Sequence, residues 1–459
     1  MSVRDLTTAP VGGLVRRLAL PASVGFFLNT MYNVVDTFWA GRFHTDALAA
    51  LSLSFPVFFI LIAMGSGFST GATALIGHAL GEDDRRRAAL YAAQGVVSAI
   101  LAAVVIMAVG YAASPSLFRL LGADGEYLSI CLEYLNVVLL GTPAVMLFYM
   151  FNGILNSQGD THSFRDYMLL ATVANVGLDP WFMYGGWGVP AMGVGGIALA
   201  TVMMQAGGAV FLGWKAWRTG LLWRGAGARW RPHWPTLREI TAQAVPSSLN
   251  LMTVAVGFFI ITWFLSGFGK AAVAAYGAAT RIEQIVLLPA LGLNVATLTL
   301  AARNAGARKY DRVRQTVRAA LSYGAAVTAA GAVLLFFGAR PLMGLFTDDA
   351  AVVDVGAPYL RIAAFIEFAY VVVMVNAAAL QGLKRPAAAL WIGLMRQVLA
   401  PAVVYWLVTR VWDLGLLGIW WALFGIAWVS AAVAVWVARR QAARLEAGDP
   451  TPPAAGVVS

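Results

Sequence analysis

Four acidic residues lie inside long apolar stretches of this sequence: Asp36, Asp179, Glu283 and Glu367. On insertion scales, a charged side chain at the centre of a bilayer costs roughly 2.5–3.5 kcal/mol, so an acid at that depth is a functional candidate. Carboxylates in an apolar environment can hold a proton or a small cation. The residue types therefore indicate ion binding inside a membrane.

Asp36 and Asp179 each have a polar neighbour one helical turn away. Tyr32 precedes Asp36 by four residues and Asn175 precedes Asp179 by four, so each pair shares one face of a helix. If the two faces converge, both carboxylates share one pocket of low dielectric. Such a pair tends to hold one proton, because desolvation and like charge both disfavour two ionised carboxylates.

Asn152 and Thr201 lie in two further apolar stretches and would add an amide and a hydroxyl to this pocket. Hard cations prefer such oxygen ligands. We therefore expect an alternative Na⁺ site formed by Asp36, Asn175, Asp179 and Thr201. The competing interpretation is that each polar residue caps a kink or holds two helices together.

Glu283 and Arg281 form a second, weaker candidate for a polar site, and Glu367 is weaker still. A structural ion pair explains Glu283 at least as well as a transport role. The four histidines fall in predicted loops without metal-ligand spacing, and Cys131 suits a small core residue. The sequence contains no phosphate-binding loop, zinc-protease motif or nucleophile elbow. These observations do not favour an enzyme.

The composition is that of a membrane protein. The chain has 459 residues, of which 60% are hydrophobic and 12% are charged, against about 45–50% apolar and 25% charged in soluble proteins. Each long apolar segment must satisfy its own backbone hydrogen bonds in lipid and is therefore expected to be a helix. Twelve such segments are expected at about residues 14–40, 47–76, 90–113, 127–150, 166–186, 193–214, 239–265, 272–300, 315–337, 357–380, 390–410 and 416–438.

The basic residues predict the orientation. Of the 32 Lys and Arg residues, 24 lie in the termini and the even-numbered loops and five lie in the odd-numbered loops. This bias places both termini in the cytoplasm. The excess of Arg over Lys, 28 to 4, is typical of a GC-rich bacterial genome. We therefore expect a multi-pass protein of the bacterial cytoplasmic (inner) membrane.

The sequence matches itself at an offset of 225 residues. Pro21 then aligns with Pro246, Gly67 aligns with Gly292, and the Tyr-Leu pair at 134–135 aligns with the pair at 359–360. Each copy holds six helices and enters the membrane from the same side, so an axis along the membrane normal is expected to relate the halves. The predicted domains are an amino-terminal lobe (1–214), a cytoplasmic linker (215–238), a carboxyl-terminal lobe (239–440) and a disordered tail (441–459).

The repeat also acts as an internal control for the acids. At the same offset Asp36 corresponds to Ile261 and Asp179 corresponds to Val404. The duplicated scaffold alone therefore does not require the two aspartates.

Several motifs in this order resemble the multidrug and toxic compound extrusion (MATE) family, over about residues 14–440. They are Pro21 with Tyr32, Asp36 and Gly41; residues 77–81; Asn152 with residues 155–160; Asn175 with Asp179 and Pro180; and residues 193–201, 281–284 and 380–386. The resemblance implies two six-helix lobes in a V shape. It also implies alternating access and export of organic cations driven by inward H⁺ or Na⁺ flow.

The amino-terminal acids are similar to those of the archaeal and DinF-type branch of that family. The resemblance implies roles in cation coupling, or in bending the first helix at Pro21, for the matching residues Pro21, Tyr32, Asp36, Asn152, Asn175, Asp179 and Thr201. The NorM-type branch instead carries acids in helices 7 and 10. Here residues 240–265 hold no acid, and Tyr370 occupies the helix 10 position.

Three other functions remain open from the sequence: a lipid-linked oligosaccharide flippase of the same superfamily, a membrane-embedded enzyme and a channel. For the transporter, the expected substrates are cationic or amphipathic drugs. We expect no cofactor beyond the coupling H⁺ or Na⁺, no nucleic-acid partner, contact with the lipid bilayer, and a monomer.

Overall fold

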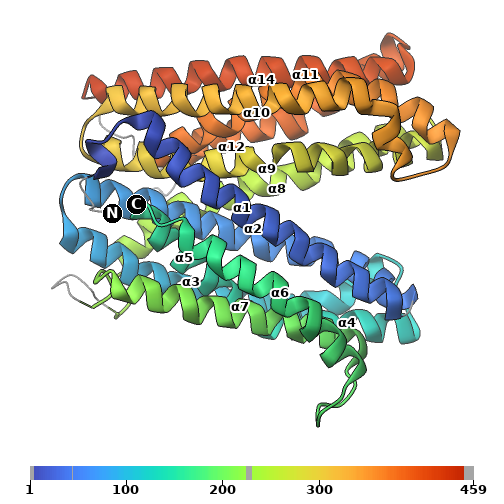
Figure 1. Ribbon diagram of the computed structural model, residues 1–459, viewed down its shortest axis with the longest axis horizontal. Helices are drawn as coiled ribbons and strands as arrows, with labels where there is room; N and C mark the ends of the chain where they lie inside the picture. Colours follow the sequence, from blue (N-terminus) through green and yellow to red (C-terminus); the bar gives the residue numbers. More distant parts are fainter. Residues whose placement is uncertain (1–4, 44, 224–229, 449–459) are drawn as a thin grey trace. The chain divides into compact units, whose positions relative to one another are not determined.

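The computed structural model describes residues 5–43, 45–223 and 230–448, and this part of the chain is almost entirely helical (Figure 1). Its elements are η1 Asp5–Thr7, α1 Val11–Phe43, α2 Thr45–Gly81, α3 Arg85–Leu120, α4 Gly125–Leu140, α5 Thr142–Ser157, α6 His162–Tyr184, α7 Gly193–Arg218, α8 Trp234–Ser266, α9 Lys270–Gly306, α10 Tyr310–Gly344, α11 Ala350–Gly382, α12 Pro386–Leu394, η2 Met395–Leu399, α13 Ala400–Trp406, η3 Leu407–Val411 and α14 Gly415–Glu446. The elements η2 and η3 are π-helical and link α12, α13 and α14.

The described helices cover all twelve expected segments. Ten spans are long and apolar enough to cross a membrane, and the pair α4 and α5, bent by 45° at a short break, makes an eleventh. The helix α6 has 23 residues, a length of about 34 Å, and carries the polar Asn175 and Asp179. An all-α membrane fold with twelve helical segments is therefore confirmed.

The chain divides into two compact units. The first, here called the amino-terminal unit, is Val24–Ser248, and the second, the carboxyl-terminal unit, combines Met1–Ser23 with Leu249–Ser459. These divisions fall inside α1 and α8, near Pro21 and Pro246, rather than at the expected boundaries 214 and 239. A proline removes one backbone hydrogen bond of its helix, so both helices are weakened close to the point where they pass from one unit to the other.

The linker and the tail also differ in extent from the expectation. The helix α7 continues to Arg218 and α8 begins at Trp234, which shortens the connection at both ends; its residues 224–229 lie outside the described part. The helix α14 continues to Glu446, where Arg314 Nη1 donates to Glu446 Oε2 at 2.8 Å. Residues 441–446 of the predicted tail are therefore helical, and residues 449–459 lie outside the described part.

The internal repeat is visible in the helix packing. A Cβ on Gly67 would meet Ala244 O and the Ser248 backbone within the amino-terminal unit, and a Cβ on Gly292 would meet Ala19 O and the Ser23 backbone within the carboxyl-terminal unit. The residues form three pairs at the 225-residue offset: Gly67 with Gly292, Ala19 with Ala244, and Ser23 with Ser248. The two copies therefore use the same close helix crossing, at which only glycine leaves room for the neighbouring backbone.

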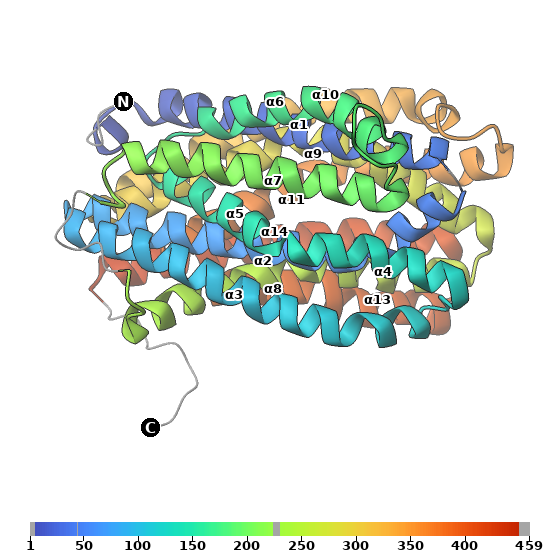
Figure 2. The same cartoon turned by 90° about the horizontal axis from the view of Figure 1, so that it is seen from below.

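Helices of the amino-terminal unit surround the polar residues singled out in the sequence. The helix α5 packs against α2, α3 and α7, and α6 packs against α7 (Figure 2). The helix α1 also packs against α6: Thr172 Oγ1 of α6 donates to Leu28 O of α1 at 3.0 Å, and the Phe26 ring contacts the Phe164 ring. This packing brings the Asp36 turn of α1 onto the polar face of α6.

Candidate cation-binding site

An amide bridges the two aspartates of the amino-terminal unit. Asn175 Nδ2 donates to Asp36 Oδ1 at 2.5 Å and to Asp179 Oδ2 at 3.0 Å. Thr201 Oγ1 donates to the other oxygen of Asp36, Oδ2, at 3.4 Å. The helices α1, α6 and α7 thus each contribute to one hydrogen-bonded cluster, here called the aspartate cluster (Asp36, Asn175, Asp179, Thr201).

Local helix geometry positions these groups. Asn175 and Asp179 are four residues apart in α6 and therefore face the same side. Pro180 follows directly and cannot donate a backbone N–H to the turn before it. The sequence spacing thus aligns one amide and one carboxylate, and the docking of α1 supplies the second carboxylate.

The aspartate cluster is removed from the surface of the chain. Asn175 and Asp179 are 0% exposed and Thr201 is 3% exposed, whereas Asp36 is half-buried. Two oxygens, Asp179 Oδ1 and Asn175 Oδ1, are buried and have no hydrogen-bond partner among the described atoms. Leaving a buried polar atom unpaired costs about 1–3 kcal/mol, so a proton or a cation bound here would remove a penalty.

Two tyrosines border the cluster. The buried hydroxyl of Tyr32 lies beside Thr201 and within electrostatic range of both aspartates. Tyr134 of α4 is also buried and lies within range of both carboxylates. Helical spacing predicts Tyr32 beside Asp36 but does not predict Tyr134 at this site, although the repeat match of Tyr134 with Tyr359 was a signal that could have identified it.

The donor set suits Na⁺ or H⁺. It offers carboxylate, amide and hydroxyl oxygens, two of them unpartnered, which are the ligands of a small hard cation. No group of three His, Cys, Asp or Glu residues able to hold a metal ion occurs in the described part of the chain. The oxygens of Asp36, Asn175, Asp179 and Thr201 therefore fit the cation expected from the sequence.

Asn152 stands apart from this network. It lies in α5 and is buried, and its Oδ1 has no hydrogen-bond partner. Among the described residues, no hydrogen bond links it to the aspartate cluster. The structure therefore brings together five of the six residues expected at the cation site, and Asn152 is not bonded to them.

Pro21 lies away from the cluster, in the half of α1 that belongs to the carboxyl-terminal unit. The helix α1 continues through it without a break. Two residues later, Ser23 Oγ donates to Pro289 O of α9 at 3.2 Å. Pro21 therefore marks the section of α1 where the helix changes its packing partners, fifteen residues before Asp36.

A second polar cluster lies in the carboxyl-terminal unit. Glu283 of α9 lies beside Tyr359 and within electrostatic range of Glu367, both of α11. Glu283 Oε1 and both carboxylate oxygens of Glu367 are buried without a hydrogen-bond partner. Arg396 of η2 lies over the Tyr370 ring, with Cζ 5.0 Å from the centroid.

Glu283, for which the sequence left a structural ion pair open, forms none among the described residues. Glu283 is buried, whereas Arg281 is exposed and the described ion pairs do not include either residue. Tyr370 does belong to this region, since it lies within electrostatic range of Glu283, Glu367 and Arg396. Arg396 lies in the π-helical element η2, and no sequence pattern predicts that surrounding.

Comparison with known proteins agrees with the fold and the repeat. The MatE family model matches this chain twice, at residues 21–181 and 246–406, so the second match begins 225 residues after the first, as the sequence predicted. A solved structure of a multidrug resistance MATE family transporter in an outward-facing conformation superposes with a TM-score of 0.90, at 25% identity, over 98% of this chain and 99% of that one.

The names of similar proteins refer to more than one kind of cargo. An FAD transporter of Shewanella oneidensis is 28% identical over 86% of this chain and 87% of its own length. A probable multidrug resistance protein NorM of Thermotoga maritima is 25% identical over 88% and 87%, and the multidrug export protein MepA of Staphylococcus aureus is 26% identical over 77% and 78%. With both halves matched by the family model, this chain is a multi-span membrane transporter and belongs to the MatE family, the family of multidrug and toxic compound extrusion.

Proposed function

We propose that this chain is a secondary antiporter that exports organic cations in exchange for inward H⁺ or Na⁺. The observation that carries the proposal is the Asn175 amide shared between Asp36 and Asp179 at 2.5 and 3.0 Å inside the amino-terminal unit. The names of its relatives, which include multidrug export proteins, also support export as the function.

The cluster can couple ion binding to conformation. When a proton or Na⁺ binds, the charge of the carboxylate pair falls and the unpartnered oxygens gain a ligand. Because α1 supplies Asp36 and α6 supplies Asp179, occupancy changes how strongly the two helices attract each other. A bound ion shifts the inward- and outward-open states only through different affinities for them, and Pro21 is our proposed point of bending in α1.

The remaining parts of the proposal concern context. We place the chain in the archaeal and DinF-type branch, since its acid pair lies in the amino-terminal unit. We further propose a monomer in a bacterial cytoplasmic membrane, with both termini inside and with cationic or amphipathic drugs as substrates. No cofactor other than the coupling ion is required.

The flippase alternative gains less support. Such a protein needs a cationic cavity for a pyrophosphate, whereas the two described polar clusters contain four carboxylates and the single cation Arg396. The FAD transporter among the relatives nevertheless makes an anionic aromatic substrate worth including in any transport assay.

The decisive experiment measures efflux of a fluorescent organic cation from proteoliposomes, with a pH gradient and a Na⁺ gradient imposed separately. We expect Asp36→Asn and Asp179→Asn each to lower gradient-driven transport at least tenfold. The matched control is Asp166→Asn, which removes a carboxylate of the same unit that pairs with Arg165 on the surface. Wild-type transport by Asp36→Asn at equal reconstitution would refute the proposal.

A further inference from the structure

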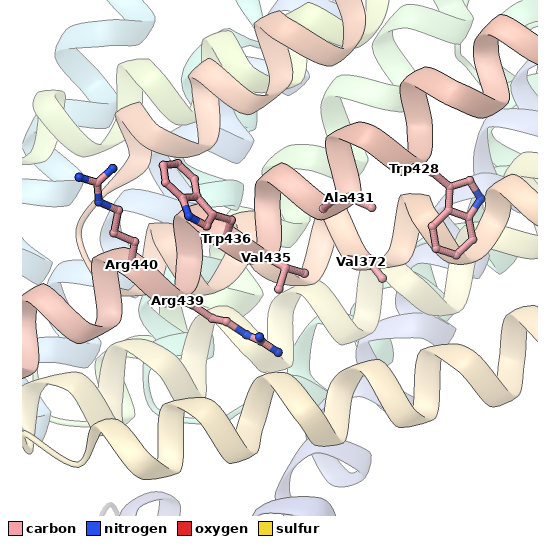
Figure 3. Close-up of a pocket in the computed structure, with 8 residues that line it drawn as sticks. Val372, Trp428, Ala431, Val435, Trp436, Arg439 and Arg440 are labelled. Carbon is pink, nitrogen blue, oxygen red and sulfur yellow. The ribbon is translucent and has the colours of Figure 1, made fainter.

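A groove of about 770 Å³ lies along α14 in the carboxyl-terminal unit, and its lining includes no residue of either polar cluster (Figure 3). Its volume is within the range of small-molecule sites, roughly 300–1,000 Å³. Val372 of α11 contributes one lining residue and α14 contributes the others: Trp428, Ala431, Ala432, Val435, Trp436, Arg439 and Arg440. The helix α11 packs against both α10 and α14.

The lining is apolar along its length and basic at one end. Val372, Ala431 and Val435 lie between Trp428 at one end and the two arginines at the other (Figure 3). The indoles of Trp428 and Trp436 are 39% and 59% exposed and are eight residues apart, about 12 Å along the helix. An amphipathic ligand with one charged end matches this arrangement.

The positive end has no acid to neutralise it within the described chain. Neither Arg439 nor Arg440 forms an ion pair with another described residue, and Arg440 Cζ lies 5.1 Å from the Trp436 ring centroid. The carboxylate of Glu446, further along α14, is held by Arg314 at 2.8 Å. Two arginines, adjacent in the sequence, therefore line the end of an apolar groove without a paired acid among the described residues.

We infer that this groove is a binding site for an anionic phospholipid. The lipid phosphate binds at the basic end of the groove, which Arg439 and Arg440 line, because guanidinium groups form charge-assisted, often bidentate hydrogen bonds to phosphate oxygens. One acyl chain lies along Val435, Ala431 and Val372 toward Trp428, and Trp436, beside Arg440, marks the headgroup boundary, as aromatic residues do at bilayer interfaces.

Other occupants fit the groove less well. A cationic drug would face two arginines without a carboxylate. A zwitterionic lipid such as phosphatidylcholine also offers a phosphate, but its trimethylammonium group would be repelled by the two arginines. Free phosphate would leave the apolar wall without a partner. The site is therefore independent of the transport function proposed above, since it shares no residue with either polar cluster.

The test is native mass spectrometry of the delipidated protein in detergent, titrated with phosphatidylglycerol, phosphatidylcholine or inorganic phosphate. We expect one phosphatidylglycerol to bind with saturation, phosphatidylcholine to bind at least tenfold more weakly, and phosphate not to compete. The double variant R439Q/R440Q should weaken phosphatidylglycerol binding at least tenfold. R439K/R440K keeps the charge and should retain most of the binding.

Two further variants separate the groove from general surface charge. Ala432→Trp fills the groove at an exposed position without changing charge and should weaken binding as much as R439Q/R440Q does. R85Q/R86Q removes two exposed arginines at the start of α3 and should bind as the wild type does. Asp36→Asn should also bind normally, which separates failure of this site from failure of the transport proposal.

Four results would overturn the inference. They are equal binding of phosphatidylcholine, competition by phosphate at the concentration of the lipid, equal loss of binding in R85Q/R86Q, and wild-type binding by Ala432→Trp. Should R439Q/R440Q fail to fold, Ala432→Trp and R439K/R440K still decide the question.

Discussion

At the scale of single residues, helical spacing predicted most of the aspartate cluster and could not predict its aromatic border. The four-residue spacing of Asn175 and Asp179 requires that they share a face, and the structure places both against Asp36. Tyr134 and Asn152 depend on how α4 and α5 pack against their neighbours. Tertiary packing places Tyr134 near the two carboxylates and leaves Asn152 without a hydrogen bond to the cluster. No local sequence pattern distinguishes these two outcomes.

The repeat places a tyrosine at equivalent positions beside the acids of both units, and this pair allows a matched test. Tyr134 lies near Asp36 and Asp179, and its equivalent Tyr359 lies beside Glu283. We predict that Tyr134→Phe weakens the apparent affinity for the coupling ion about three- to tenfold, because it removes a hydroxyl near the carboxylates while keeping the ring. Ion-titrated efflux from proteoliposomes measures this change.

The matched control is Tyr359→Phe, which removes a hydroxyl at the equivalent position of the other unit. If coupling resides in the amino-terminal unit alone, its ion dependence should equal that of the wild type. A larger effect of Tyr359→Phe than of Tyr134→Phe would transfer the coupling site to the Glu283 cluster.

At the scale of elements, the glycine crossings decide how closely helices approach. A Cβ at Gly292 of α9 would meet the backbone of Ala19 and Ser23, which cannot move aside as a side chain can. We predict that Gly292→Ala lowers the free energy of unfolding by about 1–3 kcal/mol, as overpacking does in cores. Denaturant unfolding in detergent, followed by fluorescence, measures the loss.

Gly277 provides the control on the same helix, because a Cβ there meets nothing within 4 Å. Alanine is the better helix former by about 1 kcal/mol, so Gly277→Ala should match or exceed the stability of the wild type. Equal stability of the two alanine variants would show that the crossing tolerates a Cβ.

The proline of α1 has an equivalent in α8, so replacing each in turn tests whether the proposed bending matters in α1 only. Pro21 and Pro246 both lie within three residues of the point where their helix passes between the compact units. Replacing Pro21 by alanine restores a backbone N–H donor and stiffens α1. We predict that Pro21→Ala lowers the transport turnover severalfold while binding of the substrate at equilibrium stays within twofold.

Pro246→Ala is the control, because α8 carries none of the aspartate cluster. We expect a smaller loss of turnover from it. Equal losses in both variants would show that proline bending is a general property of the repeat and is not tied to ion binding on α1.

At the scale of the whole molecule, the sequence could predict the class, the twelve helices and the repeat, because hydropathy and self-similarity are properties of the chain itself. The extent of the compact units could not be predicted in this way. Residues up to Ser23 pack with the carboxyl-terminal unit through contacts such as Arg312 Nη2 to Ala9 O at 2.6 Å and Asn304 Nδ2 to Leu6 O at 3.3 Å. Such contacts join residues about 300 positions apart and leave no local signature.

The distribution of basic residues makes a prediction about the whole chain in its membrane. The native Cys131 is fully buried, so the wild type should react little with a maleimide and serves as its own background. Arg85 begins α3 at an even-numbered loop, and Asp348 lies between α10 and α11 at an odd-numbered loop; both are exposed. With both termini inside, we predict that a membrane-impermeant maleimide labels Asp348→Cys on intact cells, whereas Arg85→Cys reacts only after the cells are opened. The opposite labelling would show that both termini lie outside. The proposed ion gradient could then not drive export in the proposed direction.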